Sequence, residues 1–453
     1  MENLIEDVDL ADDHQKPEFK AALLHIIFKC FANLLCLVVS LPCLPLFLLG
    51  ILIWGLPPTI PGWSRFCKFF IAAFTEGKPK ENIPFTNRVL LFLIFFNALV
   101  NVPINGVCWY IDELVYPSYH KVNIDEPVFM ISAPRTASTQ ICHYLENDSE
   151  NFITPIVAES ILPYIWVWKL VVPALKGLGM KQEHFLALSL FRGEASKRHE
   201  FKLNRSDTWD GLVQSWHFSV FSWYLGYSFM KWGFSYATLN EPIDEDFRKS
   251  FVPFTDCVLK KVMYCRGGPN QRMIIKGHFL LVARILEEKY PKARFFMIVR
   301  HPVERICSFI NLLKVVSTNG PYRVVHGLFP MTWRVARDYA IHTQVPYCKQ
   351  EMMFYKEPAD NKLVIPFTMY VNNLSATLQC IYSFCNIPIP DDVVSNATRT
   401  QNTTHDRTKH RASYDPNFNK SLASLGVNEE KLMECLNEYI DWINTLDSYK
   451  KTD

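Results

Sequence analysis

The sequence predicts an α/β protein with a parallel sheet flanked by helices, preceded by an N-terminal helical region associated with a membrane. Short apolar runs alternate with amphipathic helical segments at 127–146 and again at 273–308. Strands that alternate with helices in this way form parallel sheets. Two long uncharged runs, 30–56 and 89–111, indicate the membrane region, since about twenty apolar residues cross the hydrocarbon core of a bilayer.

These observations divide the chain into three parts. Residues 1–20 are acidic and polar, and we expect them to be disordered. Residues 21–120 form the membrane-associated region, and residues 121–446 form a large globular domain. The 453 residues carry a formal net charge of +2, so nothing indicates bulk binding of nucleic acid.

The run 30–56 is long enough for a transmembrane helix. Pro42, Pro45 and Gly50 interrupt it, so it forms either a kinked span or a re-entrant hairpin. The run 89–111 contains a proline as well. For both runs the alternative is a buried core helix of a soluble domain.

Two features bear on the orientation in the membrane. Lysine and arginine outnumber acids in residues 57–88, which favours a cytoplasmic location for this segment. Asn-x-Ser/Thr sequons after residue 112 favour a lumenal globular domain. We therefore expect an integral membrane protein of the ER or Golgi, and leave open the number of spans and the side of the domain. The sequons are at Asn147, Asn204, Asn373, Asn396, Asn402 and Asn419.

The stretch 127–146 predicts a strand, a tight loop and a helix. Val128 to Ile131 is an apolar run, and Ser138 and Thr139 are good residues for a helix N-terminus. A loop between a buried strand and a helix directs free N–H groups at a ligand, and Arg135 adds a positive charge. The pattern predicts a phosphate or sulfate site; the alternative is an ordinary turn with a surface arginine.

The stretch 273–308 predicts strand, loop, helix, strand, loop and helix. Lys276 and His278 follow the first strand, and Arg300 follows the second. Ligands of parallel sheets lie at the carboxyl ends of the strands. We therefore expect Lys276, His278 and Arg300 to converge with Arg135 in an anion site that also holds a candidate base.

The segment between these two motifs contains three further features. Glu159 is the sole acid in an apolar neighbourhood, where a carboxylate either forms an ion pair or takes part in chemistry. Residues 192–210 are rich in charge and are expected to form a solvated loop. Residues 209–236 are dense in aromatic side chains, which suits an apolar acceptor pocket or a lipid-facing surface, although a core helix is the alternative.

From residues 127 to 442, outside the membrane segments, the chain resembles the sulfotransferases that use 3′-phosphoadenylyl sulfate. It is similar to the branch that reads Pro-Arg-(Thr/Ser)-Gly-(Thr/Ser)-Thr. Residues 134–139 take the place of the loop for the 5′-phosphosulfate, with Ala137 in place of the usual glycine. Alanine suits this position if its φ is negative. The resemblance implies a P-loop-like sulfotransferase fold and makes 121–446 the catalytic domain.

The resemblance also implies roles for individual residues. Lys276-Gly277-His278 resembles a Lys-x-His motif in which the histidine is the base, a role that its ordinary pKa suits. Glu159 resembles the glutamate that serves some members as base. Arg300 and Ser308 resemble the pair that binds the 3′-phosphate, and a basic cluster at 409–411 would close over it. The implied catalytic residues are His278, Glu159 and Lys276; the implied donor-binding residues are Arg135, Thr136, Ala137, Ser138, Thr139, Arg300, Ser308, Lys409 and Arg411, without a metal.

We therefore expect sulfuryl transfer from 3′-phosphoadenylyl sulfate to a hydroxyl or amine of a lipid-like or membrane-borne acceptor. The expected partners are membrane lipids and this acceptor, and not nucleic acid. A glycan becomes an equal acceptor if the domain is lumenal. The non-enzyme alternative is a membrane-bound scaffold on an inactive sulfotransferase fold. A nucleotide kinase would need a glycine-rich loop with lysine, and a strand that ends in aspartate for magnesium.

Overall fold

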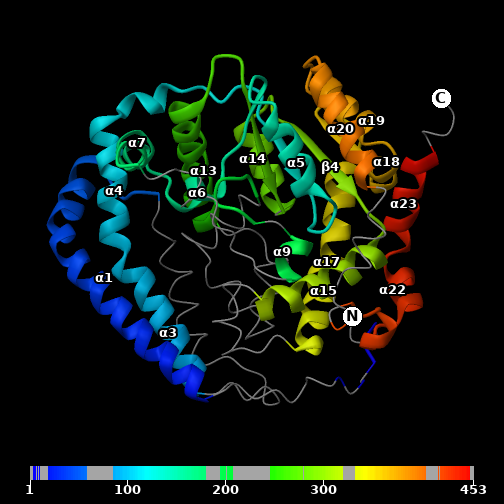
Figure 1. Cartoon of the computed structure of the whole chain (residues 1–453), viewed down its shortest axis with the longest axis horizontal. Helices are drawn as coiled ribbons and strands as arrows, with labels where there is room; N and C mark the ends of the chain where they lie inside the picture. The colour runs from blue at the N-terminus through cyan, green and yellow to red at the C-terminus, as the bar shows by residue number, and fades with distance from the viewer. Residues whose placement is uncertain are drawn as a thin grey trace.

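The computed structural model defines the core of the globular domain and most of the N-terminal helical region (Figure 1). The residues that it describes are 4–6, 8, 10, 19–58, 85–179, 194–199, 201–207, 245–278, 280–319, 332–404, 417 and 419–448.

A parallel sheet of five strands forms the centre of the domain, in the order β2-β3-β1-β4-β5. Strand β1 is fully buried between β3 and β4, as its unbroken apolar run predicts. Every pairing is parallel, which confirms the expected fold class. The strands are β1 (Val128–Ile131), β2 (Phe152–Ile153), β3 (Arg272–Gly277), β4 (Arg294–Val299) and β5 (Lys362–Pro366).

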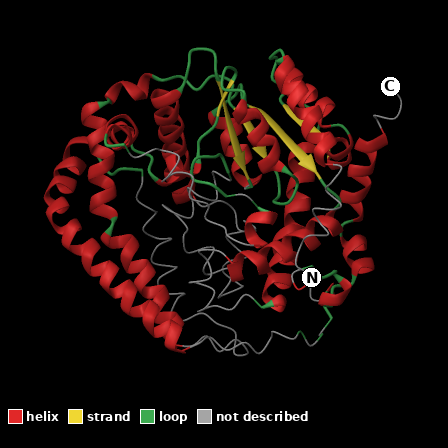
Figure 2. Cartoon of the chain, in the orientation of Figure 1, coloured by secondary structure: helices red, strands yellow, loops and turns green. Residues whose placement is uncertain are grey.

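Helices cover both faces of the sheet (Figure 2), because successive residues of each strand point to opposite sides. Phe129 and Phe295 face one core, and Met130 and Phe296 face the other. The first core is built with α13 (Glu245–Arg266), α14 (Leu280–Lys289), α15 (Pro302–Asn319), α17 (Trp333–Tyr355) and α23 (Asn437–Ser448). The second core is built with α5 (Ser138–Asn147), α18 (Phe367–Asn372) and α19 (Leu374–Phe384).

The remaining described elements complete the domain. They are η2 (Pro117–Lys121), α6 (Val157–Ile161), η3 (Val167–Val171), α7 (Val172–Gly177), α9 (Glu194–Arg198), α20 (Asp391–Thr404), η6 (Ala423–Leu425) and α22 (Glu429–Cys435).

The N-terminal region contains three helices, α1 (Phe19–Trp54), α3 (Phe85–Val100) and α4 (Val102–Val115). Among the described residues, one helical segment, Ile26–Trp54 within α1, is long and apolar enough to cross a membrane. The second uncharged run does not form one helix. It is divided at Asn101, and a proline in the first turn of α4 suits a new helix start.

Helix α4 packs against the globular domain rather than against lipid alone. The Asp112 carboxylate is fully buried, lies 2.9 Å from Lys261 Nζ, and accepts the backbone N–H of Ile165. Trp109 stacks on Phe254 at 6.0 Å between ring centroids. Removing one partner of such a buried ion pair costs roughly 3–5 kcal/mol, so α4 is an integral part of the domain.

The first described residues also pack against the domain, whereas we expected residues 1–20 to be disordered. Leu4 and Leu10 are buried, and Ile5 forms an antiparallel bridge with Val427. The Glu6 N–H donates to the Gly426 carbonyl at 2.7 Å. Apolar residues spaced among the acids therefore anchor this segment beside α22, where Figure 1 shows the N-terminus.

Candidate active site

The loop that follows β1 has an unusual backbone. Arg135 and Ala137 both have positive φ, 74° and 67°. The condition of a negative φ at Ala137 is therefore not met, and this residue rather than Ser138 or Thr139 is the N-cap of α5. Left-handed geometry costs an L-residue roughly 1–2 kcal/mol. Strained residues of this kind within one loop are typical of concave arrangements of backbone N–H groups that bind anions.

The hydroxyls of the loop have different surroundings. Thr136 is fully buried, and its Oγ1 donates to the Ala133 carbonyl at 3.1 Å, so it holds the loop together. Ser138 is buried at the first turn of α5. The first N–H groups of a helix have no acceptor within the helix, and the positive end of the helix dipole lies there. In α5 these are the groups of Ser138 and Thr139, because the Gln140 N–H already donates to the Ala137 carbonyl at 3.0 Å.

Basic residues from two further elements converge on this loop. Arg135 Nε donates to Ser308 Oγ of α15 at 3.0 Å. Arg300, directly after β4, donates from Nη1 to the Arg135 carbonyl at 3.2 Å. Its other nitrogens contact Glu304, whose side chain is 60% exposed, at 3.1 and 3.2 Å. Arg300, Ser308 and Arg135 therefore form one cluster, as the strand-end positions predict.

Lys276 of β3 joins the cluster at the N-terminus of α5. Its ammonium donates to Thr139 Oγ1 and to Asp207 Oδ1, both at 2.7 Å. His199 Nε2 lies 2.9 Å from the second oxygen of Asp207. Burial would raise the pKa of Asp207, but Lys276 and His199 together lower it well below its usual value. Asp207 is therefore a buried carboxylate that fixes the ammonium against Thr139.

The sequence did not indicate Asp207 or His199 as site residues. The expectation of a solvated loop at 192–210 is wrong for the part that the structure describes. The side chains of Glu194, Arg198 and Asp207 are 9%, 5% and 2% exposed, and α9 packs against α15. A stretch rich in charges resembles a solvent-facing loop in sequence when its partners lie far away along the chain, as Lys276 does here.

His278 follows β3 and contacts the same loop. Its Nδ1 lies 2.7 Å from the Ser132 carbonyl oxygen. A carbonyl oxygen accepts and cannot donate, so the proton lies on Nδ1, and Nε2 is the acceptor nitrogen of the ring. Burial, followed by the charge of Lys276, lowers the pKa of His278 to about 3. The ordinary pKa that we expected is therefore wrong, and the ring is neutral at physiological pH.

Glu159 forms the ion pair that was one of its two sequence interpretations. Its carboxylate lies 2.6 Å from Arg266 Nε and 2.8 Å from Nη2. It also accepts the Ile156 N–H at 3.0 Å, which caps the short helix α6. These contacts occupy both carboxylate oxygens and give Glu159 a structural task.

A network of buried side chains holds the loop after β1 in place. The Glu351 carboxylate of α17 accepts the Ala133 N–H at 2.8 Å and lies 2.6 Å from Arg305 Nη1. Tyr439 Oη donates to the same carboxylate at 2.6 Å. Arg305 and Glu351 are fully buried. The network therefore connects the loop after β1 with α15, α17 and α23.

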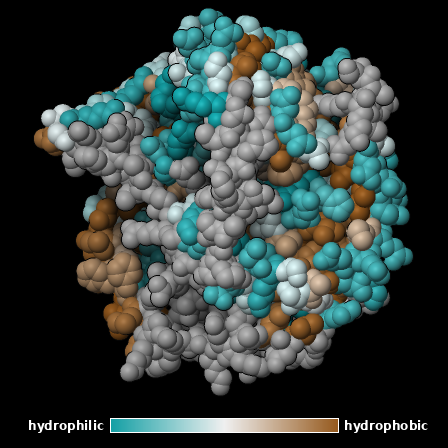
Figure 3. Space-filling model, turned by 45° about the vertical axis from the view of Figure 1, so that its right-hand side comes forward, coloured by the Kyte–Doolittle hydropathy of each residue, from teal (hydrophilic) through white to brown (hydrophobic). Residues whose placement is uncertain are grey.

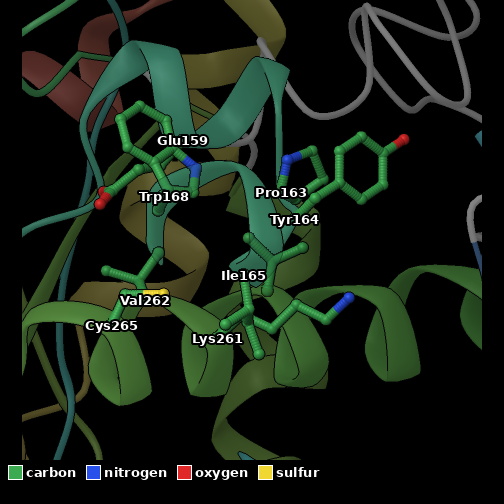
Figure 4. A pocket seen from close by; sticks show the side chains of 9 residues that line it. Glu159, Pro163, Tyr164, Ile165, Trp168, Lys261, Val262 and Cys265 are labelled. Atoms are coloured by element: carbon green, nitrogen blue, oxygen red, sulfur yellow. The ribbon is translucent and has the colours of Figure 1, made fainter. Parts of the chain in front are cut away.

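A separate small pocket, open to solvent on one side, lies between the segment around Glu159 and helix α13. In Figure 4, Glu159 and Trp168 lie on one side of it, and Lys261, Val262 and Cys265 line it from α13. None of the residues at the strand ends lines this pocket. It is therefore distinct from the cluster at the loop.

Three features with an expected role lie outside the described residues. They are Lys409 and Arg411, expected over the 3′-phosphate, and the aromatic tract at 209–236.

Solved structures that are similar to this chain define the class of fold. The sulfotransferase STF9 from Mycobacterium avium matches with a TM-score of 0.57 at 14% identity, over 87% of this chain and 95% of that one. The sulfotransferase STF1 from Mycobacterium tuberculosis matches with a TM-score of 0.56 at 14% identity, over 86% and 97%. The protein therefore has the sulfotransferase fold. No curated protein matches the sequence.

The family model described as the sulfotransferase family matches residues 127–391, more than half of the chain. The chain belongs to the sulfotransferase family. The matched segment contains the loop after β1, Lys276, His278, Arg300 and Ser308, and it begins after α4. Sulfuryl transfer is therefore the general chemistry of this family and fold.

Proposed function

We propose that the protein transfers a sulfuryl group from 3′-phosphoadenylyl sulfate to a hydroxyl or amine of a lipid-like, membrane-borne acceptor. The observation that carries the proposal is the convergence of Arg135, Lys276 and Arg300. Each follows or ends a different strand, and all three lie around the N-terminus of α5. This is a concentration of fixed positive charge beside free N–H groups.

The residues fit a nucleotide donor with phosphate at both ends. The strained loop and the first turn of α5 present N–H groups, which suits a 5′-phosphosulfate. Arg300 and Ser308 lie beyond Arg135 and would hold a 3′-phosphate. Because Glu304 is exposed, its carboxylate can leave Arg300 when a phosphate competes for the guanidinium.

The donor supplies the sulfuryl group and a phosphate leaving group. Transfer of such a group proceeds in line, with charge on the peripheral oxygens, so positioning and fixed positive charge lower most of the barrier. Lys276 is held against Thr139 by Asp207, at the end of the site where we assign the leaving group. Arg135 adds a second cation on the same loop.

We assign His278 as the base that accepts the acceptor's proton at Nε2. In the free protein its pKa of about 3 makes it a weak base. Anionic charge nearby favours the protonated ring, so a bound donor would raise this pKa towards the working range. Glu159 remains the rival base, but its ion pair with Arg266 would have to open first.

The membrane-borne acceptor is proposed from the apolar N-terminal helices, which are part of the same molecule. Large hydrophobic side chains such as Leu24, Phe28 and Leu52 are 67%, 67% and 83% exposed on α1. Surfaces of this kind are typical of contact with lipid. A glycan acceptor would require a lumenal domain. The sequons Asn373, Asn396 and Asn419 are exposed and compatible with that side.

Selective binding of the 3′-phosphorylated nucleotide tests the donor. We expect 3′-phosphoadenosine 5′-phosphate to raise the melting temperature more than ATP or adenosine 5′-phosphate does. Arg300→Ala should weaken the 3′-phosphorylated nucleotide by roughly 10- to 100-fold, the value of one or two charged hydrogen bonds, and leave adenosine 5′-phosphate unchanged. Arg284→Ala, at an exposed position of α14, is the control. Equal losses for both nucleotides would remove Arg300 from the 3′ site.

Turnover of radiolabelled donor with panels of lipid and glycan acceptors tests the second half of the proposal. Transfer to lipids and not to glycans is the expected result. Donor binding without transfer to any acceptor would favour the inactive scaffold.

A further inference from the structure

The helices α1 and α3–α4 lie side by side in parallel, which is an unusual arrangement for two apolar segments that follow each other in one chain. Asn33 Nδ2 donates to the Leu93 carbonyl, and Asn97 Nδ2 lies 3.6 Å from Cys36 Sγ. Further along, Gly106 packs on Phe47 and Gly50 on Tyr110. As the residue number in α1 increases from pair to pair, the number of its partner in α3–α4 increases too. The two segments therefore run in the same direction along their whole contact.

The register has a direct consequence for the membrane. Two helices that pack in parallel at the same depth can both span a bilayer if the chain between them crosses back. The connection after Gly55 would have to do so. Its sequence carries Arg65, Lys68, Glu76 and Lys78, and seven residues is its longest uncharged stretch after Arg65. About twenty apolar residues are needed for a helix to cross, and an extended chain leaves its polar backbone unsatisfied in lipid. Paired spans are therefore excluded.

The two ends of α1 are also tied to the same globular domain. At its C-terminal end, the Gly55 carbonyl accepts Tyr110 Oη of α4 at 2.7 Å, and Trp54 stacks on the same ring. Helix α4 is fixed to the domain by the buried pair Asp112–Lys261. At the other end, Leu10 is buried in the domain, and eight residues separate it from Phe19.

The eight residues between Leu10 and Phe19 are too few to allow a transmembrane α1. Nine peptide steps reach about 30 Å when fully extended. A spanning α1 would begin on the far side of a hydrocarbon core of about 30 Å, with polar headgroup layers in addition. Residues 4–10 could not then remain on the domain. The 36 residues of α1, about 54 Å in length, instead extend along one side of the molecule, as Figure 1 shows.

The outer face of α1 is nevertheless too apolar for water. Its exposed side chains include Phe31 at 66%, Leu34 at 59%, Val38 at 59% and Leu52 at 83%. Figure 3 shows hydrophobic atoms gathered along the left edge of the molecule, the side on which Figure 1 places α1. No charged residue occurs between Cys30 and Leu56. An exposed apolar surface of this length marks a contact with lipid or protein, and the uncharged strip suits the acyl region of a lipid leaflet.

We infer that α1 lies in the plane of the membrane, immersed in a single leaflet, and that the chain does not cross the bilayer. The N-terminus, the connection after Gly55 and the globular domain are then on the same side. The inference rests on the packing of the helices and is independent of the donor, the acceptor and the catalytic residues. A substrate held in that leaflet could reach the domain by lateral diffusion.

Three epitope tags decide the topology. They are placed before Met1, between Gly77 and Lys78, and after Asp453, each in a separate full-length chain expressed in sealed microsomes. We expect proteinase K to give the same result for all three tags, either all cleaved or all protected, with all cleaved once detergent is added. A single α1 span would place the N-terminal tag opposite the other two, and a hairpin of two spans would isolate the central tag. Either pattern would overturn the inference.

Flotation with liposomes of phosphatidylcholine and phosphatidylserine tests the lipid-facing strip. The double variant Leu24→Glu/Leu52→Glu changes two exposed positions and so leaves the core intact. We expect it to lose at least ten-fold in the fraction bound. Met433→Glu, on α22 and 41% exposed, is the matched control and should bind as the unmodified protein does. Failure of the unmodified protein to float, or equal binding by both variants, would contradict the inference.

Discussion

At the scale of single residues, the site combines a strained loop, a lysine with a buried counter-ion and a neutral histidine. Ala137 adopts a conformation that suits glycine, and Asp207 fixes the ammonium of Lys276. His278 donates from Nδ1 to Ser132, which orients the ring and leaves Nε2 as its acceptor. In the proposed mechanism these residues hold the donor, fix the cation at the leaving group and accept the proton.

The first prediction at this scale concerns the base. His278→Ala should lower turnover by roughly two or more decades, the usual value of general base catalysis, while binding of 3′-phosphoadenosine 5′-phosphate persists. Glu159→Gln should reduce thermal stability through its contact with Arg266, with a smaller effect on turnover. Initial rates and calorimetric titration measure both variants. If Glu159→Gln abolishes turnover and His278→Ala does not, the roles are reversed.

The second prediction concerns the strained loop. Ala137→Gly should stabilise the protein by roughly 1 kcal/mol, because glycine adopts a φ of 67° without the steric penalty of a Cβ atom. Donor affinity should be retained or improved. Ala376→Gly, inside helix α19, should have the opposite sign and lose roughly 1 kcal/mol. Chemical denaturation of both variants provides the comparison, and destabilisation by Ala137→Gly would show that the φ angle is not strained.

At the scale of elements, the N-terminal segment around Ile5 packs across the C-terminal part of the domain; we call this segment the N-terminal strap. Gly426 has a φ of 72° and ends the short helix η6. A Cβ atom on Gly426 would lie 2.7 Å from the Glu6 carbonyl oxygen and 2.7 Å from Val8. The strap therefore requires glycine at this position for two reasons, its left-handed backbone and the close approach of the other chain segment.

We accordingly predict that Gly426→Ala destabilises the protein more than Gly179→Ala does. Gly179 has a similar φ of 80° but no neighbouring atom within 4 Å of an added Cβ. It should lose about 1 kcal/mol from backbone strain alone. Gly426→Ala should lose a further 1–3 kcal/mol from the clash, together with protection of the N-terminal segment from proteolysis. Equal losses would indicate that residues 4–10 are not seated on the domain in solution.

At the scale of the whole molecule, the sheet, the N-terminal helices and the C-terminal helices form one continuous structure. Asp112 of α4 connects the helical region to α13, and Glu351 connects the loop after β1 to α15 and α23. The apolar face of α1 and the site are thus parts of one body, so the proposed attachment of α1 to a leaflet would also orient the site.

The stability of the whole molecule should fall in mild acid because of His278. The folded protein binds this proton near pH 3, whereas an unfolded histidine binds it near pH 6.5. Between pH 3 and pH 6.5, unfolding therefore takes up a proton, and the free energy of unfolding falls as the pH drops below about 6.5. The loss from this residue should be roughly 1 kcal/mol at pH 5.5, about one pH unit below the ordinary pKa of histidine. His278→Gln should flatten the dependence of the melting temperature on pH between 7 and 5.5; an unchanged slope would contradict the assignment.

The sequence alone determined the fold class. Unbroken apolar runs at 128–131 and 295–299 predict buried strands, and prolines and helical periodicity delimit the helices between them. Because ligands of parallel sheets lie at the strand ends, the convergence of Arg135, Lys276 and Arg300 followed from their positions after the strands. Local patterns of this kind depend on near neighbours in the chain, and the sequence displays them directly.

The tertiary structure decided what depends on distant partners. Asp207 became a site residue because Lys276, 69 positions away, lies beside it. Ala137 has a positive φ in the loop between β1 and α5, and the pKa of His278 is lowered because the chain buries it beside a lysine. The parallel register of α1 with α3–α4 is likewise invisible in hydropathy, which measures whether a segment can enter lipid and not the direction in which its neighbour runs.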